Sequence, residues 1–386
     1  GAILKFPVGQ PRQWNTNNLL GSAYGLWLED AYTLNGNPLG IGLMVSNSGA
    51  NTIALPLILN GRKTFDVAGT LTLSGALSGT GALSKAGTGT LNLNTACAFT
   101  NTTIVSNGTL RLNGPTTNAA LPVSGAAIWL RADTIAGLAD GAGVASWTDE
   151  SGNARNATQG TGASQPLFKT NIQNGLPVVR FDGGDDRMTY DGTFMANTDY
   201  TIFIVESRAD ATDSYILQGT DNNTDRNLHY GYRNNTTFTH AQYANDYDMT
   251  VDGYVLPEFT MFASDLNAGA SMKNTWRNGK FLGSKANGTR LISYTGATIG
   301  GSGSSFKGDI AEIVMFTRAL TEKDRQLVES YLMSKWLPAL SYNGGLKIAQ
   351  PGTVDVNARN LRVTGLDNEN GGGGVVFATG TPVTNT

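Results

Sequence analysis

Acidic side chains are the residues of this sequence best suited to chemistry, but their spacing does not match a hydrolase site. A retaining glycosidase needs two carboxyl groups about 5 to 5.5 Å apart, which alternate positions of one strand can supply. The segment GDIAEI places Asp309 and Glu312 three residues apart, so we expect them on opposite faces of a strand. His229 and His240 are expected on strand surfaces, and no Gly-x-Ser-x-Gly elbow is present. The sequence predicts no catalytic residues and no enzyme; paired acids from distant segments stay an open alternative.

Three aspartates are candidate calcium ligands. Asp182, Asp185 and Asp186 lie in the segment FDGGDD, and calcium coordinates several oxygen atoms at such loops. A second, weaker candidate is the segment DNNTD, which begins at Asp221. The alternative is that these side chains bond neighbouring backbone groups, as Asp and Asn do in turns. Calcium is the one cofactor that the sequence suggests.

A group of tyrosines is a candidate ligand-binding surface. Tyr230, Tyr232, Tyr243, Tyr247 and Tyr254 lie among asparagines and aspartates. Rings that stack on sugars, beside amides that hydrogen-bond to them, predict carbohydrate binding. Alternating tyrosines are equally typical of a strand at a solvent-exposed edge, and this reading stays open.

Composition excludes several classes of protein. The net charge is −3, so no basic surface is available for nucleic acid, and no run of about 18 apolar residues could span a membrane. The single cysteine, Cys97, excludes internal disulfides and thiolate zinc sites. Charged residues make up only 15% of the chain and glycines number 49, a composition typical of strands and turns. The first residue is Gly1, which suggests a piece of a longer precursor.

Internal repeats give the strongest signal for architecture. The segment GTLTL begins at Gly69, GTLNL at Gly89 and GTLRL at Gly108, and a weaker copy, GTVDV, begins at Gly352. In each copy glycine makes the turn and the two apolar residues share one face, which predicts one strand per copy. A period near 20 residues is typical of a β-solenoid, in which each turn of chain buries its apolar face against its neighbours.

The segment from Gly81 to Gly114 resembles the autotransporter-associated β-strand repeat, in which glycine-flanked TL strands alternate with a threonine-rich strand. This resemblance implies a β-helical stalk of a secreted or surface-displayed bacterial protein. Residues 1–60 fit the repeat poorly. The segments LMVSN and NTIALPLILNG predict strands, whereas Trp14 to Trp27 is expected to be irregular.

The middle of the chain predicts a different domain. Short apolar runs such as YTIFIVESR from Tyr200 are separated by Gly, Asn and Asp turns, and the RNG at Arg277 predicts a tight hairpin. One helix is expected after Thr321, which can cap it. Its expected apolar face contains Leu327, Val328, Tyr331, Leu332 and Trp336.

Three segments of this region carry a second resemblance. Trp129 to Gln159, Asn174 to Met188 and Phe306 to Trp336 resemble, in order, the concanavalin A-like, laminin G-type domains of bacterial surface proteins. The resemblance implies a two-sheet jelly roll that binds glycans or proteins, sometimes with calcium at its rim.

Together these observations predict an all-β chain in three regions. Residues 1–124 form a β-helix-like repeat region, residues 125–342 a laminin G-like β-sandwich with one C-terminal helix, and residues 343–386 resume the repeat scaffold. The predicted function is a non-enzymatic, extracellular or cell-surface, structural or adhesion protein. Its partners would be further copies, joined through β-strand edges into a filament or sheath, or surface glycans and proteins. The alternative is a calcium-assisted carbohydrate-binding module of a larger adhesin.

Overall fold

The chain consists of two compact units. The computed structural model describes residues 2–10, 14–18, 20–75, 77–94, 97–99, 101–112, 120–251, 258–301, 303–337, 345–356, 366–367 and 375–377. The first unit combines Gly1–Asn118 with Met333–Thr386, and the second is Ala119–Leu332. The predicted boundaries at 124/125 and 342/343 stay a prediction, because the second falls outside the described residues.

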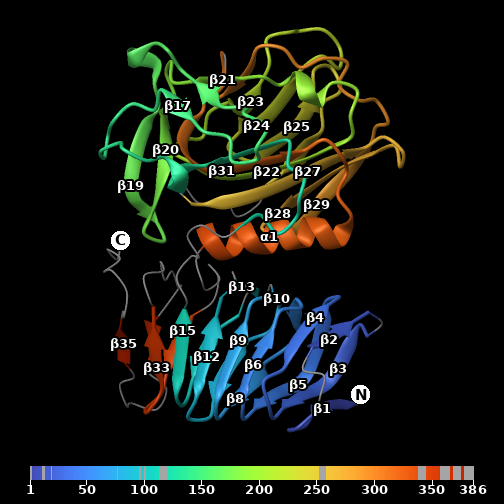
Figure 1. Cartoon of the computed structure of the whole chain (residues 1–386), viewed down its shortest axis with the longest axis vertical. Helices are drawn as coiled ribbons and strands as arrows, with labels where there is room; N and C mark the ends of the chain where they lie inside the picture. The colour runs from blue at the N-terminus through green and yellow to red at the C-terminus, as the bar shows by residue number, and fades with distance from the viewer. Residues whose placement is uncertain are drawn as a thin grey trace. The chain divides into compact units, whose positions relative to one another are not determined.

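The first unit contains an eight-stranded parallel sheet (Figure 1). Neighbouring copies of the repeat pair in register, so that Thr70, Thr90, Thr109 and Thr353 form one row across the sheet. In sheet order the strands are β2 (Trp14–Asn17), β4 (Thr33–Gly36), β6 (Ala50–Ile53), β9 (Thr70–Leu73), β12 (Thr90–Leu93), β15 (Thr109–Leu112), β33 (Thr353–Asp355) and β35 (Val375–Phe377).

A second parallel sheet of eleven strands forms the rest of the coil. Its strands are β1 (Ile3–Phe6), β3 (Ser22–Leu28), β5 (Leu39–Asn47), β7 (Leu57–Leu59), β8 (Lys63–Val67), β10 (Leu77–Gly79), β11 (Leu83–Ala86), β13 (Cys97–Phe99), β14 (Thr103–Val105), β32 (Leu346–Ile348) and β34 (Leu366–Asp367). The sheet divides at β5, whose residues Leu39–Ile41 pair with β7 and Met44–Asn47 with β8. Each turn of chain therefore lays one strand on each of three faces.

This arrangement is a β-solenoid and confirms the architecture predicted from the repeats. Leu71, Leu73, Leu91 and Leu93 alternate along their strands and are almost fully buried inside the coil. The expectation that Trp14 to Trp27 is irregular is wrong, because β2 and β3 lie there and pair in parallel with β4 and β5. These early turns lack the GTL signature yet keep the same alternation of apolar residues.

The solenoid continues after the second unit. Strand β14 pairs with β32 and β15 pairs with β33, although the whole second unit lies between them in the chain. The second unit is therefore an insertion within the solenoid, and β33 lies within the GTVDV segment that was predicted to be a strand.

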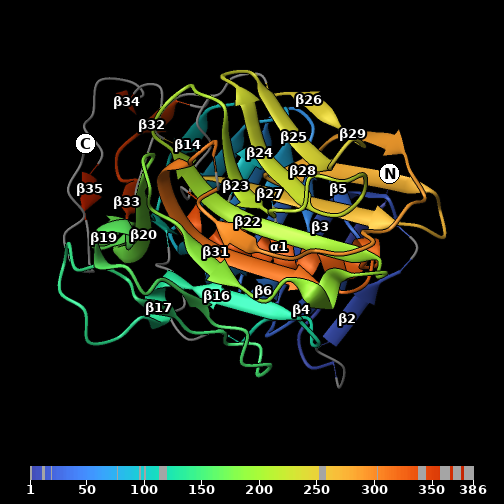
Figure 2. The ribbon, with the colours of Figure 1, turned by 90° about the horizontal axis from the view of Figure 1, so that it is seen from above.

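The second unit contains two antiparallel eight-stranded sheets (Figure 2). One contains β16 (Ile128–Arg131), β19 (Leu167–Gln173), β20 (Leu176–Asp182), β22 (Tyr200–Arg208), β27 (Thr260–Asn267), β28 (Met272–Arg277), β29 (Lys280–Ala286) and β31 (Lys307–Phe316). The other contains β17 (Ser146–Trp147), β18 (Ala157–Thr158), β21 (Met188–Tyr190), β23 (Ser214–Gln218), β24 (Leu228–Asn234), β25 (Thr237–Gln242), β26 (Asp248–Thr250) and β30 (Ala297–Ile299). Three short 3-10 helices, η1 (Ala132–Thr134), η2 (Gly162–Ser164) and η3 (Thr193–Met195), lie between strands.

The two sheets share one apolar core. Phe238 of β25 stacks on Phe262 of β27 with ring centroids 3.8 Å apart, which joins the sheets directly. The predicted hairpin between β28 and β29 is present, and Asn278 and Gly279 adopt the positive φ angles of 50° and 75° that its turn requires.

The predicted helix is α1 (Glu322–Trp336), and the Thr321 Oγ1 atom accepts a hydrogen bond from the Asp324 backbone N–H at 3.2 Å. The Arg325 guanidinium lies 4.0 Å from the ring centroid of Trp276, so the helix covers the sheet that contains β28. Leu327, expected on the apolar face, is 42% exposed and does not belong to that face. No helix in the described part of the chain is long and apolar enough to cross a membrane.

Candidate assembly surface

The carboxylates of the predicted calcium loop all accept hydrogen bonds from groups of the protein. The Asp182 Oδ1 atom accepts from the Gly184 N–H at 2.7 Å, and the Asp186 Oδ2 atom accepts from the Asp182 N–H at 2.9 Å. The Asp185 Oδ2 atom accepts from the Ser164 hydroxyl at 2.5 Å. Burial raises the pKa of Asp186 to about 6. Over the described residues, no group of three or more His, Cys, Asp or Glu side chains could hold a metal ion.

The structure does not bring the predicted tyrosines to one surface. Tyr230 and Tyr232 are fully buried, and their hydroxyls bond Ser264 at 2.9 Å and Glu206 at 2.5 Å. These two positions of the prediction are wrong, because alternate residues of β24 point into the core. Tyr243 and Tyr247 are partly exposed, and Tyr254 lies outside the described residues.

The histidines also differ from their expected surface positions. His240 is fully buried, and its Nε2 atom lies 2.9 Å from the Tyr200 hydroxyl. Burial lowers the pKa of His240 well below its usual value. His229 is half-buried, and its ring stacks on that of Tyr215 and meets that of Tyr243 edge-on, at centroid distances of 5.0 and 5.4 Å. Its Nε2 atom has no hydrogen-bond partner among the described residues.

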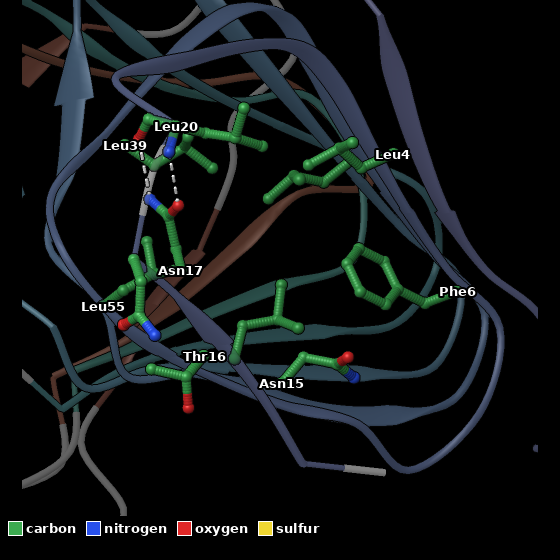
Figure 3. Close-up of a pocket in the computed structure, with 11 residues that line it drawn as sticks. Leu4, Phe6, Asn15, Thr16, Asn17, Leu20, Leu39 and Leu55 are labelled. Carbon is green, nitrogen blue, oxygen red and sulfur yellow. Dashed lines mark hydrogen bonds between the residues drawn. The ribbon is translucent and has the colours of Figure 1, made fainter. Parts of the chain in front are cut away.

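A hollow of about 370 Å³ lies at the first turns of the solenoid. Figure 3 shows Leu4 and Phe6 on one side of it, and Asn17, Leu39 and Leu55 on the other. Asn17 donates to the Leu20 carbonyl at 2.8 Å and accepts from the Leu20 N–H at 2.9 Å, which holds the rim of the hollow in place. The lining is therefore mainly apolar, with a short polar rim.

The hollow exists because interior positions of the solenoid reach the end of the coil there. Leu4 and Phe6 of β1 pair with Leu26 and Leu28 of β3, which are buried. Leu4 and Phe6 themselves are only half-buried. Among the described residues, β1 pairs only with β3 and β2 only with β4. Their outer edges therefore present backbone N–H and C=O groups with no strand beside them.

Apolar side chains are concentrated around this end. Six of the ten large apolar side chains that are exposed in the described part of the chain belong to the first 43 residues: Ile3, Val8, Leu20, Tyr24, Trp27 and Leu43. Ile3, Val8 and Leu20 lie on or next to the edge strands β1 and β2, whereas Tyr24, Trp27 and Leu43 lie on β3 and β5, which have a strand on both sides. Exposed apolar residues close to an unpaired strand edge are typical of an interaction site. We call Ile3, Val8 and Leu20, together with the hollow and the edges of β1 and β2, the N-terminal end surface.

The other end of the solenoid has complementary strand edges. Within the described residues, β34 pairs only with β32 and β35 pairs only with β33. Every pairing in the two solenoid sheets is parallel. A strand added at either end in the same direction would continue the parallel sheet without a change of pattern.

Comparisons with known proteins show no family for this chain. No protein-family model matches it, and no curated protein matches it. Domain 4 of AbnA, a GH43 extracellular arabinanase from Geobacillus stearothermophilus, aligns with a TM-score of 0.41 and 15% identity over 53% of this chain and 98% of that domain. A Trypanosoma rangeli sialidase in complex with sialic acid aligns with a TM-score of 0.42 and 13% identity, over 58% of this chain and 36% of its own length. The CBM40 of a Ruminococcus gnavus sialidase, bound to α2,3 sialyllactose, aligns with a TM-score of 0.32 and 15% identity, over 40% of this chain and 96% of its own length.

These findings overturn the family assignment made from the sequence. The chain is similar to arabinanase and sialidase structures, and neither the laminin G-type family nor the autotransporter-associated repeat is found. The quoted segments specify local features, namely glycine turns, a threonine-rich strand and a helix that follows a buried strand. Such features recur in unrelated all-β proteins and do not define a family. The fold itself is a β-solenoid with an inserted all-β unit.

Proposed function

We propose that this chain is a non-enzymatic, extracellular structural subunit whose copies join end to end through their solenoids. The observation that carries the proposal is the N-terminal end surface, where an apolar hollow of about 370 Å³ lies beside two strand edges. A solenoid end without a polar capping turn is a surface that favours association.

The occupant of this surface is the C-terminal end of a second copy. Strands β34 and β35 offer edges of the same two sheets whose first strands are β1 and β2. Because all the pairings are parallel, only head-to-tail stacking continues both sheets in the same direction. A head-to-tail contact joins two different surfaces and leaves a free end of each kind, so it produces an open filament.

Burial of apolar surface supplies the driving force. Ile3, Val8 and Leu20 are 55%, 63% and 45% exposed. Fully burying one such side chain stabilises a complex by about 1.5 to 3 kcal/mol, before the cost of ordering it. The parallel strand hydrogen bonds add direction and register to this contact.

The test is sedimentation velocity over a rising concentration series, with negative-stain electron microscopy of the same samples. We expect the wild-type chain to form filaments and Leu20→Lys to remain monomeric, since it places a charge at the hollow. Phe281→Lys is the matched control, because Phe281 is 52% exposed but lies on β29 of the second unit. A wild-type chain that stays monomeric at the highest concentration, or equal behaviour of the two variants, would refute the proposal.

Carbohydrate binding is the second candidate function, favoured by the surroundings of His229. Its Nε2 atom is buried and has no hydrogen-bond partner in the described part of the chain, and its ring contacts that of the partly exposed Tyr243. A sugar that displaced the Tyr243 ring would meet a polar atom for one hydroxyl and an aromatic ring for its face. A glycan array with wild type and His229→Ala tests this candidate. Binding that the variant loses would support it, and a blank array would exclude it for the glycans printed. Loss of binding on adding a chelator would identify the calcium-assisted form.

A further inference from the structure

Lys273 is a buried amine with little to bond to. Its side chain, on β28, is fully buried, and among the described residues its Nζ atom donates one hydrogen bond, to the Asn245 main-chain oxygen at 3.0 Å. Lys85 of the solenoid is also fully buried, yet its Nζ atom donates to three carbonyl oxygens. A buried ammonium group normally has such a set of acceptors. Lys273 is therefore a poor place for a permanent charge.

The surroundings of Lys273 favour the neutral amine. Burial lowers its pKa to about 7, with nearby Lys285 acting in the same direction and Asp225 and Asp246 opposing it. About half of the molecules would then carry an uncharged amine at neutral pH, and an uncharged, desolvated lysine is a nucleophile.

Asn245, whose main-chain oxygen accepts the hydrogen bond from this amine, also carries a side-chain carboxamide. Its Nδ2 atom donates to the Asp225 Oδ1 atom at 2.7 Å, and Asp225 is only 5% exposed. Because a carboxylate only accepts, this bond fixes which end of the amide faces Asp225. The Asp225 main chain is held by hydrogen bonds to Tyr243 at 3.0 Å and Ile292 at 2.7 Å. The carboxylate thus touches the nitrogen that would leave in a substitution at this amide.

We propose that Lys273 and Asn245 form an intramolecular isopeptide bond, with Asp225 as the catalytic residue that transfers the proton. The neutral Lys273 Nζ atom attacks Asn245 Cγ, so an Nζ–Cγ bond forms and the Cγ–Nδ2 bond breaks. The proton lost by Nζ passes through the Asp225 carboxylate to Nδ2, which leaves as ammonia. One amide replaces another, and neither an oxidant nor water is consumed.

The bond would have a mechanical consequence that goes beyond the proposed assembly. Lys273 belongs to the sheet that contains β27 and β28, whereas Asn245 lies between β25 and β26 of the other sheet. The cross-link would tie the two sheets together covalently. Pulling the sheets apart would then require breaking an amide bond rather than separating packed side chains.

The test is intact-mass spectrometry of the purified full-length chain, followed by peptide mapping. We expect the wild type to be lighter than its sequence mass by one ammonia, about 17 Da. The map should contain one branched peptide that joins the segments around Asn245 and Lys273. A wild-type mass equal to the sequence mass, with both linear peptides recovered, would overturn the proposal.

Three variants locate the bond. Lys273→Met and Asp225→Asn should each show their full sequence mass, the first because the nucleophile is gone and the second because proton transfer fails. Lys280→Met is the control, since Lys280 of β29 is exposed and is not one of the charged groups that shift the pKa of Lys273, and it should keep the loss of ammonia. A loss that persists in Lys273→Met would place the chemistry elsewhere and refute the assignment. If a variant does not fold, the wild-type peptide map still shows whether the bond between Lys273 and Asn245 is present.

Discussion

Arg111 and Asp355 lie 244 residues apart in the chain, yet the Arg111 Nε atom donates to the Asp355 Oδ2 atom at 2.8 Å. The two residues are register partners on β15 and β33, the strands on either side of the insertion. The Thr109 and Thr353 hydroxyls meet at 2.9 Å in the same pair of strands. The two segments of the solenoid on either side of the insertion are thus joined by side-chain contacts as well as by strand hydrogen bonds.

Removing the guanidinium should weaken the solenoid where it resumes. The Asp355 side chain is fully buried, whereas that of Arg111 is 41% exposed. We expect Arg111→Ala to lower the free energy of unfolding of the solenoid by about 1 to 3 kcal/mol, because a buried carboxylate loses its charged partner. Urea denaturation, monitored through the proteolysis of the C-terminal strands, measures this loss of unfolding free energy.

Lys347→Ala is the matched control for this prediction. Lys347 and Asp367 form an ion pair of 3.6 Å in the same unit, but both side chains are largely exposed. An exposed pair contributes little, so this variant should unfold like the wild type. Equal losses in the two variants would show that burial of Asp355 does not matter.

Lys85 should make the stability of the solenoid depend on pH in the alkaline range. It shares a row with Phe65 and Val105, and its Nζ atom donates to the carbonyls of Ala86, Gly87 and Asn107. Burial lowers the pKa of Lys85 from 10.5 to about 8, so between these values the unfolded chain binds more protons than the folded one. Stability from this group therefore rises as the pH goes from 8 to 10.5.

The measurement compares thermal unfolding of wild type and Lys85→Met over that pH range. We expect the difference in unfolding free energy to grow in favour of the wild type as the pH rises. A difference that stays constant with pH would contradict the lowered pKa. Lys347→Ala, at an exposed lysine, again serves as the control.

The row of GTL copies could be predicted from the sequence because each copy carries its own turn, its own alternation and its own register. The strands between Trp14 and Trp27 could not, since Leu26 keeps the alternation without a recognisable glycine signature. The segments LMVSN and NTIALPLILNG, in contrast, were predicted as strands and lie in β5, β6 and β7. The sequence predicted association through β-strand edges but did not identify the apolar residues of the N-terminal end surface. One signal was Leu20, which lies in the segment that had been expected to be irregular.

Side-chain burial in the second unit was harder to predict. Tyr230 and Tyr232 alternate with Gly231 on β24, a pattern that a strand at a solvent-exposed edge would also have. The two tyrosines are buried because the opposite sheet covers the face of β24 on which they lie. His240 is buried in the same way, and its Nε2 atom lies 2.9 Å from the hydroxyl of Tyr200, which belongs to that opposite sheet. Pairings between sheets are long-range contacts that a periodic pattern does not contain.

Glu206 should make the second unit less stable as the pH rises from about 4.5 to neutrality. It is fully buried, the Tyr232 hydroxyl donates to its Oε1 atom, and its Oε2 atom has no hydrogen-bond partner in the described part of the chain. Burial raises its pKa from 4.5 to about 7, against the opposing effect of Tyr232 and two arginines. The folded chain holds this proton when the unfolded chain has lost it, so stability is full below pH 4.5 and falls up to pH 7.

The variant Glu206→Gln removes this proton while keeping an acceptor for Tyr232. We expect the unfolding free energy of the variant, relative to that of the wild type, to increase by about 3 kcal/mol between pH 4.5 and pH 7. Chemical denaturation at several pH values measures the difference. A gap that does not change with pH would mean that Glu206 is already ionised in the folded chain.

Chelation should leave the stability of the second unit unchanged, because donors of the protein already occupy the carboxylates of the aspartate loop. The carboxylates of Asp182, Asp185 and Asp186 accept hydrogen bonds from Gly184, Ser164 and the Asp182 backbone, so a cation would have to displace these donors. We therefore expect the same melting temperature with calcium and with a chelator, and a lower one for Asp186→Ala, which removes an acceptor from a buried N–H. A saturable rise with calcium that Asp186→Ala abolishes would instead establish this loop as a calcium site and strengthen the carbohydrate-binding candidate.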